Sequence, residues 1–208
     1  RYGINKEKIH VVYRGLKKID AIKPKPYRNT DYPIVFGFMG GCASHKGLDT
    51  LIAAFSRLDQ NKAKLVVYGW ENQEYIGKIK AKQLNIEFKG TYEHEAINHV
   101  FEEIDVGVVP SIWYEAFGLV GIEFLQARIP IIVSDLCGVA ETIEDGKTGF
   151  TIKPNDTNAL LEKLELFITN PELIRSLQKN IKRFKSVEEH ASELELIYSE
   201  LIRGVEYE

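Results

Sequence analysis

The segment IVFGFMG, residues 34–40, decides the fold. It is apolar throughout, a second glycine follows it at Gly41, and a helical spacing of apolar residues begins at Leu48. A strand that is apolar without alternation is buried on both faces, which is typical of a parallel sheet covered by helices. The segment therefore predicts the first strand of an α/β core.

The same rhythm of apolar strand and amphipathic helix continues along the chain. Five further strand segments follow: KLVVYGW (64–70), IEFKG (86–90), DVGVVPS (105–111), IPIIVSD (129–135) and GFTIKP (149–154). Helical patterns cover 48–58, 76–84, 93–103, 117–127 and 139–144, and three more close the chain over 157–169, 171–181 and 187–203. We expect a doubly wound, Rossmann-like parallel sheet of about six strands, with ligands bound beyond the carboxyl ends of the strands.

The residues before this core have a different character. Ile9–Tyr13 fits a short edge strand, and residues 17–32 combine proline with many charges, which is typical of a linker. We interpret residues 1–32 as the edge strand and linker of a preceding domain, 33–185 as the ligand-binding domain and 186–208 as a C-terminal helix. We therefore expect the chain to be part of a larger protein.

Composition excludes several classes of protein. The 208 residues carry a net charge of −3 with both signs interspersed, so no basic patch predicts a nucleic-acid partner. The two cysteines, Cys42 and Cys137, have no CxxC partner, which favours a reducing compartment. No apolar run approaches the ~20 residues of a membrane helix. We expect a cytoplasmic protein.

The loop GGCASHKG, residues 40–47, combines two features of a phosphate site. Gly40 and Gly41 allow the backbone to approach a ligand closely, and Lys46 stands just ahead of a helix whose first amides favour an anion. The spacing is that of neither a P-loop nor a dinucleotide-binding loop. A tight turn with a solvated lysine is the alternative explanation.

The stretch PSIWYEAFGLVGIEFLQA, residues 110–127, is the most informative. Glu115 and Glu123 would lie roughly 12 Å apart if a continuous helix joined them. That separation exceeds the ~5–9.5 Å of a hydrolytic carboxylate pair and suits two ends of one long ligand. Gly118 and Gly121 leave the helix start bare, so a diphosphate is predicted to accept hydrogen bonds from the amides near Phe117 to Leu119. Two solvated glutamates on an ordinary helix are the alternative.

The remaining patterns are weaker. SDLCGVAETIEDGKTGF, residues 134–150, contains Ser134, Gly138 and Glu141 at a strand end, where ligand contact and a plain helix cap both stay open. His94 and His99 are five residues apart and would diverge on a helix, so they do not form a zinc pair. No D-x-D pair occurs, and we therefore expect no metal-held diphosphate.

Together these loops resemble the carboxyl-terminal, donor-binding domain of the family-four retaining glycosyltransferases of the GT-B fold. The most specific likeness is the Glu-x7-Glu pattern EAFGLVGIE (115–123) with PS just upstream. The segments 40–47, 134–150 and SELELIYSEL (192–201) fit the same order and spacing. The resemblance extends from KIHVVYRG (8–15) through the last helix.

The resemblance implies a role for each matching residue. Glu115 lies by the donor sugar ring, Lys46 faces the diphosphate and Glu123 holds the ribose hydroxyls, so that Lys46 and Glu115 are the implied catalytic residues. Many members place an arginine where this chain has Gly41, so either the amides of the glycine loop replace it or the affinity for the diphosphate is reduced. The implied donor-binding residues are Gly40, Gly41, Lys46, Gly90, Thr91, Tyr92, Ser111, Glu115, Ala116, Phe117, Gly118, Leu119 and Glu123.

The implied activity is transfer of a hexosyl group from a UDP or GDP sugar to an acceptor hydroxyl, with retention and without cofactor or metal. The implied acceptor is a sugar or lipid-linked glycan, bound by the preceding domain, through which the protein would also reach a membrane surface. This chain alone is then expected to be inactive. Two alternatives stay open: a nucleotide-sugar epimerase of related fold and a non-catalytic nucleotide-sugar-binding module.

Overall fold

The computed structural model describes residues 3, 5–6, 9–17, 19 and 32–205. Its internal contacts divide the chain into two compact units, residues 19–182 and residues 1–18 together with 183–208. The boundary after residue 182 lies three residues before the one we expect after residue 185. Residues 20–31 of the expected linker lie outside the described residues.

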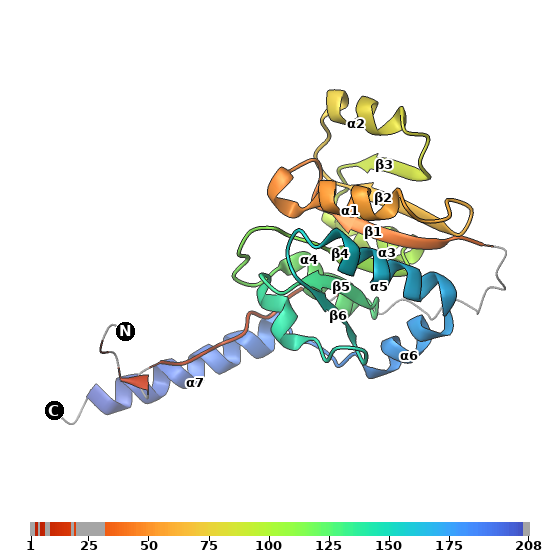
Figure 1. Ribbon diagram of the computed structural model, residues 1–208. Coiled ribbons are helices and arrows are strands. Elements are labelled where there is room, and N and C mark those ends of the chain that lie inside the picture. The colour runs from red at the N-terminus through yellow and green to blue at the C-terminus, as the bar shows by residue number, and fades with distance from the viewer. Residues whose placement is uncertain (1–2, 4, 7–8, 18, 20–31, 206–208) are drawn as a thin grey trace. The chain divides into compact units, whose positions relative to one another are not determined.

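The larger unit is built on a six-stranded sheet in the order β3-β2-β1-β4-β5-β6, with every pair of neighbouring strands parallel (Figure 1). This confirms the predicted doubly wound, Rossmann-like fold. The strands are β1 (Ile34–Met39), β2 (Ala63–Tyr68), β3 (Ile86–Gly90), β4 (Val106–Val109), β5 (Ile131–Ser134) and β6 (Gly149–Ile152).

Helices join the strands close to the predicted positions. They are α1 (Leu48–Phe55), α2 (Gln73–Lys80), α3 (Ile97–Glu103), α4 (Leu119–Gln126), α5 (Thr157–Thr169) and α6 (Glu172–Asn180). Short 3-10 helices are η2 (Ser44–Lys46), η3 (His94–Ala96) and η4 (Gly138–Thr142). The helix expected over 139–144 is thus a 3-10 helix, and α4 begins two residues later than expected.

The two faces of the sheet are distinguished by alternate residues of β1. Phe36 and Phe38 are buried in the core beneath α1 and α5, which pack against each other. Gly37 faces the opposite way, toward Ile104 at the end of α3. Phe124 of α4 contacts Phe101 of α3, with ring centroids 5.3 Å apart. Helices therefore cover both faces, as Figure 1 shows.

The strand order reverses direction between β1 and β4. From β1 the chain proceeds outward to β2 and β3, and then returns to build β4, β5 and β6 on the other side. Connections that leave neighbouring strands in opposite directions open a crevice at the carboxyl ends of those strands. The loops 40–47 and 110–118, which follow β1 and β4, meet at this switch point.

The smaller unit contains α7 (Val187–Val205). Ser186 and Glu189 form a capping box at its start: the Glu189 amide donates to Ser186 Oγ, and the Ser186 amide donates to the Glu189 carboxylate. Leu16 bridges to Ser186, and residues 9–13, where we expect an edge strand of a preceding domain, form no strand within this chain. Among the described residues, no helix is both long and apolar enough to span a bilayer.

Candidate donor site at the carboxyl edge of the sheet

The central feature of the site is an ion pair that joins the two loops of the switch point. Lys46 Nζ lies 2.9 Å from Glu115 Oε1 and donates a hydrogen bond to it. The Lys46 side chain is 34% exposed and that of Glu115 is 17% exposed, so the pair opens to solvent mainly from the lysine side. The two residues implied as catalytic are therefore neighbours, although 69 positions separate them in the sequence.

Ser111 fixes the distance between these loops. Its side chain is fully buried, and its Oγ lies 3.1 Å from the His45 carbonyl oxygen and 3.3 Å from that of Trp113. The Ile112 amide donates to the same His45 carbonyl at 3.0 Å. The Ser111 hydroxyl is thus used within the protein, and the geometry makes Ser111 a positioning residue for the Lys46–Glu115 pair.

The glycines of the first loop of the site, residues 40–47, also form hydrogen bonds within the protein. The amides of Gly40 and Gly41 both donate to the Tyr68 carbonyl, at 3.0 and 2.9 Å. Gly41 has φ +59°, and a Cβ there would lie 2.5 Å from the backbone N and O of Trp70. These two amides therefore do not replace the arginine that many family members carry, and no side chain fits at position 41.

The second loop of the site, residues 110–118, is held by the third, residues 134–150. The Glu115 amide donates to the Leu136 carbonyl, and the Gly138 amide donates to the Glu115 carbonyl at 2.8 Å. A Cβ on Gly138 would lie 2.3 Å from the Ala116 carbonyl oxygen, so these loops touch at the backbone. Gly138 therefore packs against the second loop, and its close approach fixes the backbone on both sides of Glu115.

The start of α4 is bare, as the sequence predicts. Gly118, with φ +72°, is the N-cap and supplies no side-chain cap. The first helical hydrogen bonds come from the amides of Gly121 and Ile122 to the Gly118 carbonyl. The amides of Leu119 and Val120 therefore have no partner within the helix, which is the arrangement that accepts an anion.

Glu123 lies on α4 beyond this bare start. The helix begins at Leu119 and not at Glu115, so the 12 Å separation expected for a continuous helix does not apply. The Glu123 carboxylate is half-buried, and burial raises its pKa, while the charge of nearby His94 lowers it. No hydrogen bond holds it among the residues that the structure describes. A half-buried carboxylate without a hydrogen-bond partner is costly, which favours an external ligand for Glu123.

The loop after β3 faces Glu123. Burial, and secondarily the Glu123 charge, raise the pKa of Tyr92 to about 12. The Tyr92 ring stands edge-on to that of Tyr68, with centroids 5.6 Å apart and planes at 89°. The Gly90 carbonyl accepts from the Gly69 amide at 2.8 Å. Gly90, Thr91 and Tyr92 thus form a fixed loop at the β3 end of the same edge.

The pKa shift of Glu123 predicts a pH-dependent effect on stability. A raised pKa in the folded state means that protonated Glu123 contributes stability at low pH, and that this contribution is lost as pH rises through the folded pKa. Glu123→Gln is neutral at every pH, so we expect it to unfold at higher urea than the wild type at pH 7 and at the same urea at pH 4. Urea denaturation at the two pH values measures this, with exposed Glu165→Gln as the control. Equal shifts at both pH values contradict the expectation.

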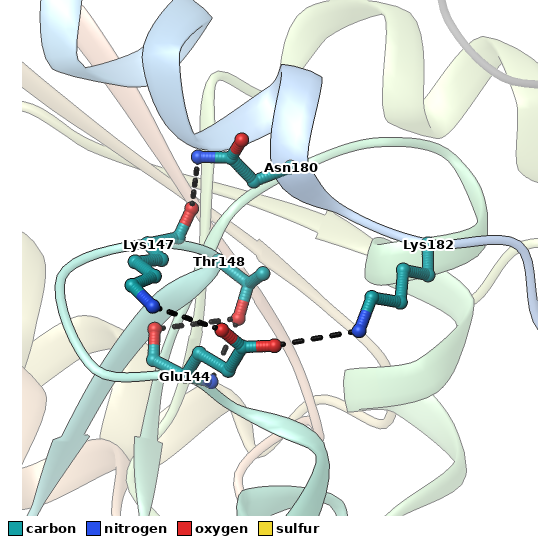
Figure 2. Close-up of polar contacts among 5 residues, drawn as sticks. All are labelled: Glu144, Lys147, Thr148, Asn180 and Lys182. Atoms are coloured by element: carbon teal, nitrogen blue, oxygen red, sulfur yellow. Dashed lines mark hydrogen bonds and ion pairs between the residues drawn. The ribbon is translucent and has the colours of Figure 1, made fainter.

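The third loop closes on itself in the turn Glu144–Gly149. Figure 2 shows Lys147 and Lys182 reaching Glu144, and Asn180 donating to the Lys147 carbonyl at 3.1 Å. The Glu144 amide donates to the buried hydroxyl of Thr148 at 2.9 Å. Lys147, and then Lys182, hold the pKa of the Glu144 carboxyl below its usual range. These contacts hold the turn against α6, so its conformation needs no bound ligand.

Thr148→Val removes the acceptor for the Glu144 amide in a buried position. We expect the free energy of unfolding to fall by about 1–2 kcal/mol, the usual cost of an unmet buried hydrogen bond. Lys147→Ala is the matched control, because it keeps the carbonyl that Asn180 uses and removes only a solvent-exposed ion pair, so its effect is smaller. A larger loss in Lys147→Ala than in Thr148→Val, measured by urea denaturation, contradicts this order.

Sequence reasoning missed the position of His94. The spacing of His94 and His99 excludes a zinc pair, and in the structure His99 contacts Glu102 at 3.3 Å. Among the described residues, no group of three or more His, Cys, Asp or Glu side chains is placed to hold a metal. His94 instead lies near Glu123. No sequence signal reveals this neighbour, because it depends on how η3 packs beside α4.

Comparison with known proteins agrees with this fold. A family model described as glycosyl transferases group 1 matches residues 19–184. An uncharacterized glycosyltransferase of Methanocaldococcus jannaschii is 31% identical over 181 residues, 86% of this chain and 49% of that protein. Sucrose-phosphate synthase of Thermosynechococcus elongatus superimposes with a TM-score of 0.74 at 26% identity, covering 85% of this chain and 47% of that one.

A further structure shows the same fold at lower identity. HepE of Anabaena, solved in complex with UDP and glucose, has a TM-score of 0.78 at 19% identity, covering 95% of this chain and 59% of that one. The doubly wound sheet of this chain matches the fold of GT-B glycosyltransferases. This chain belongs to the group 1 glycosyl transferases. It spans about half the length of the relatives that it matches.

Proposed function

We propose that this chain binds a nucleoside diphosphate sugar along the carboxyl edge of its sheet and forms the donor-binding half of a retaining, metal-independent hexosyltransferase. The observation that carries the proposal is the Lys46–Glu115 pair at the switch point, beside the bare start of α4. One ammonium and a row of helix amides suit a diphosphate. The half-buried Glu123 carboxylate, with Tyr92 facing it, suits the ribose hydroxyls and base at the β3 end.

The proposed reaction uses charge rather than a protein nucleophile. As the glycosidic bond breaks, negative charge grows on the leaving diphosphate, and Lys46 and the first amides of α4 stabilise it in place. Lys46 exchanges its contact with Glu115 for the phosphate, which frees the Glu115 carboxylate to accept a hydroxyl of the sugar. An acceptor hydroxyl then forms the new bond to the anomeric carbon from the face of the departing diphosphate and gives its proton to a phosphate oxygen, so the configuration is retained.

The acceptor is proposed to be a sugar or a lipid-linked glycan, bound by a domain outside this chain. An epimerase is the alternative that shares the same donor site, and it needs no acceptor. Incubating the whole protein with the nucleotide sugar alone distinguishes the two, because only an epimerase converts the sugar under these conditions. A binding module with no activity would bind the donor and leave it unchanged in the presence of every acceptor.

A thermal-shift screen against UDP, GDP and ADP sugars tests the proposal. A ligand that binds only the folded chain adds about 2.7 kcal/mol of apparent stability at 100 times its dissociation constant. We expect one base to raise the unfolding midpoint clearly above the other two, in proportion to the logarithm of the ligand concentration. A screen in which none of the nucleotide sugars shifts the midpoint contradicts the proposed function.

A further inference from the structure

The exposed large apolar side chains of the sheet domain follow the carboxyl ends of its strands. Within residues 33–182, all of which the structure describes, the exposed large hydrophobic residues lie at the carboxyl ends of β2 and β4 or at the start of α4. They are Trp70, Ile112, Trp113, Tyr114 and Leu119. Large apolar groups gathered in one exposed area usually mark a binding surface. These residues lie on the loop that carries Glu115 or follow strands next to the one that leads to Lys46.

Trp113 and Tyr114 are the most exposed of this group, at 66% and 78%. Their backbone is nevertheless fixed on both sides. Ser111 Oγ contacts the Trp113 carbonyl, and the backbone of Glu115 is bonded to the third loop in both directions. The two rings are therefore held out from an anchored segment, and they contribute little to the core of this chain. Such a segment suits an apolar ring surface that a ligand covers.

The position of the rings along the sheet edge indicates which part of a ligand they meet. In strand order the edge runs from Tyr92 after β3, past Lys46 after β1, to Trp113 after β4. A donor with its nucleoside at Tyr92 and Glu123, and its diphosphate at Lys46, carries its sugar to the β4 side. Sugar rings present apolar C–H faces, which aromatic rings cover well, as they do other apolar surfaces.

We propose that Trp113 and Tyr114 form an aromatic platform that binds the hexose of the donor and determines its selection over the free nucleoside diphosphate. This inference rests on the proposed function and deepens it, because it assigns the sugar end of the same site. Glu115, the next residue, then lies at the edge of the ring, where a carboxylate accepts a hydroxyl. Trp70 is as exposed as Trp113 but follows β2, on the other side of the Lys46 loop.

The test compares two ligands that differ only in the sugar: UDP and UDP-glucose, or the corresponding GDP or ADP pair if the thermal-shift screen selects that base. Calorimetry on the double variant Trp113→Ala/Tyr114→Ala is expected to show sugar-nucleotide affinity reduced about 5- to 10-fold, with affinity for the diphosphate unchanged. The single variant Trp113→Phe is expected to retain most of the sugar-nucleotide affinity that the double variant loses, because it keeps an aromatic face. Trp70→Ala is the matched control and leaves the difference between the two ligands as in the wild type.

The outcomes separate this inference from the proposed function. Suppose that the wild type binds the diphosphate and that the double variant loses affinity for both ligands equally, or for neither. The proposed role of Trp113 and Tyr114 is then wrong, and the proposed donor site is unaffected. If the wild type binds no nucleotide, the proposed function is wrong and the platform with it. A thermal unfolding curve for each variant verifies that the substitutions, which are at exposed positions, leave the fold intact.

Discussion

Lys46→Ala weakens binding of the donor nucleotide by roughly 30- to 150-fold, or about 2–3 kcal/mol, if the diphosphate lies where we place it. The ammonium lies 2.9 Å from Glu115, so its removal also leaves a carboxylate unpaired at the diphosphate position. Repulsion between that carboxylate and the phosphates adds to the lost hydrogen bond. The effect is therefore expected near the upper end of the range, and it is measured by calorimetric titration with the nucleoside diphosphate.

Lys78→Ala provides the control for charge alone. Lys78 pairs with Glu74 on the exposed surface of α2, so its removal changes the net charge by the same amount at a position outside the site. Its donor affinity is expected to equal that of the wild type. A Lys46→Ala variant that binds the nucleotide within twofold of the wild type removes Lys46 from the donor site and overturns its proposed role in the reaction.

Gly41→Arg introduces the residue that many family members carry at this position, and we expect it to destabilise the chain rather than improve binding. A Cβ at position 41 would lie 2.5 Å from two backbone atoms of Trp70, and the backbone has φ +59°. Strain of this kind and the forced displacement of packed backbone together cost about 2–5 kcal/mol. Urea denaturation is expected to show a loss of this size in the free energy of unfolding.

Gly77→Ala is the matched control for this substitution. Gly77 is exposed on α2, its φ is not positive, and a Cβ there meets no atom within 4 Å. Alanine is the better helix former by about 0.5–1 kcal/mol, so this variant is expected to be slightly more stable than the wild type. A Gly41→Arg variant with wild-type stability and tighter donor binding would mean that the first loop opens to admit the arginine.

The sequence predicts the sheet well because most of its strands are short apolar runs bounded by polar residues or glycine. β1, β2 and β4 need no knowledge of their partners to be recognised. Ile9–Tyr13 has the same β-branched composition but forms no strand, because a strand exists only when a neighbour pairs with it. The late start of α4 follows from the left-handed conformation of Gly118, which composition alone does not reveal.

The sequence predicts which residues lie at the site better than it predicts the contacts between them. Strand-end position places Lys46 and Glu115 at the same edge, yet their direct ion pair depends on the buried Ser111, which sets the spacing of the two loops. The sequence leaves the amides of Gly40 and Gly41 free for a ligand, but in the structure both donate to the Tyr68 carbonyl of the neighbouring strand. Hydrogen bonds between strands distant in sequence are decided by register, and so the sequence alone does not give them.

A crystal structure of the chain with its nucleoside diphosphate tests the central claim most directly. We predict a phosphate oxygen about 3 Å from Lys46 Nζ, a second near the first amides of α4, and the ribose hydroxyls on the Glu123 carboxylate. A nucleotide bound elsewhere on the chain, with Lys46 still paired to Glu115 and Glu123 facing solvent, would contradict the account.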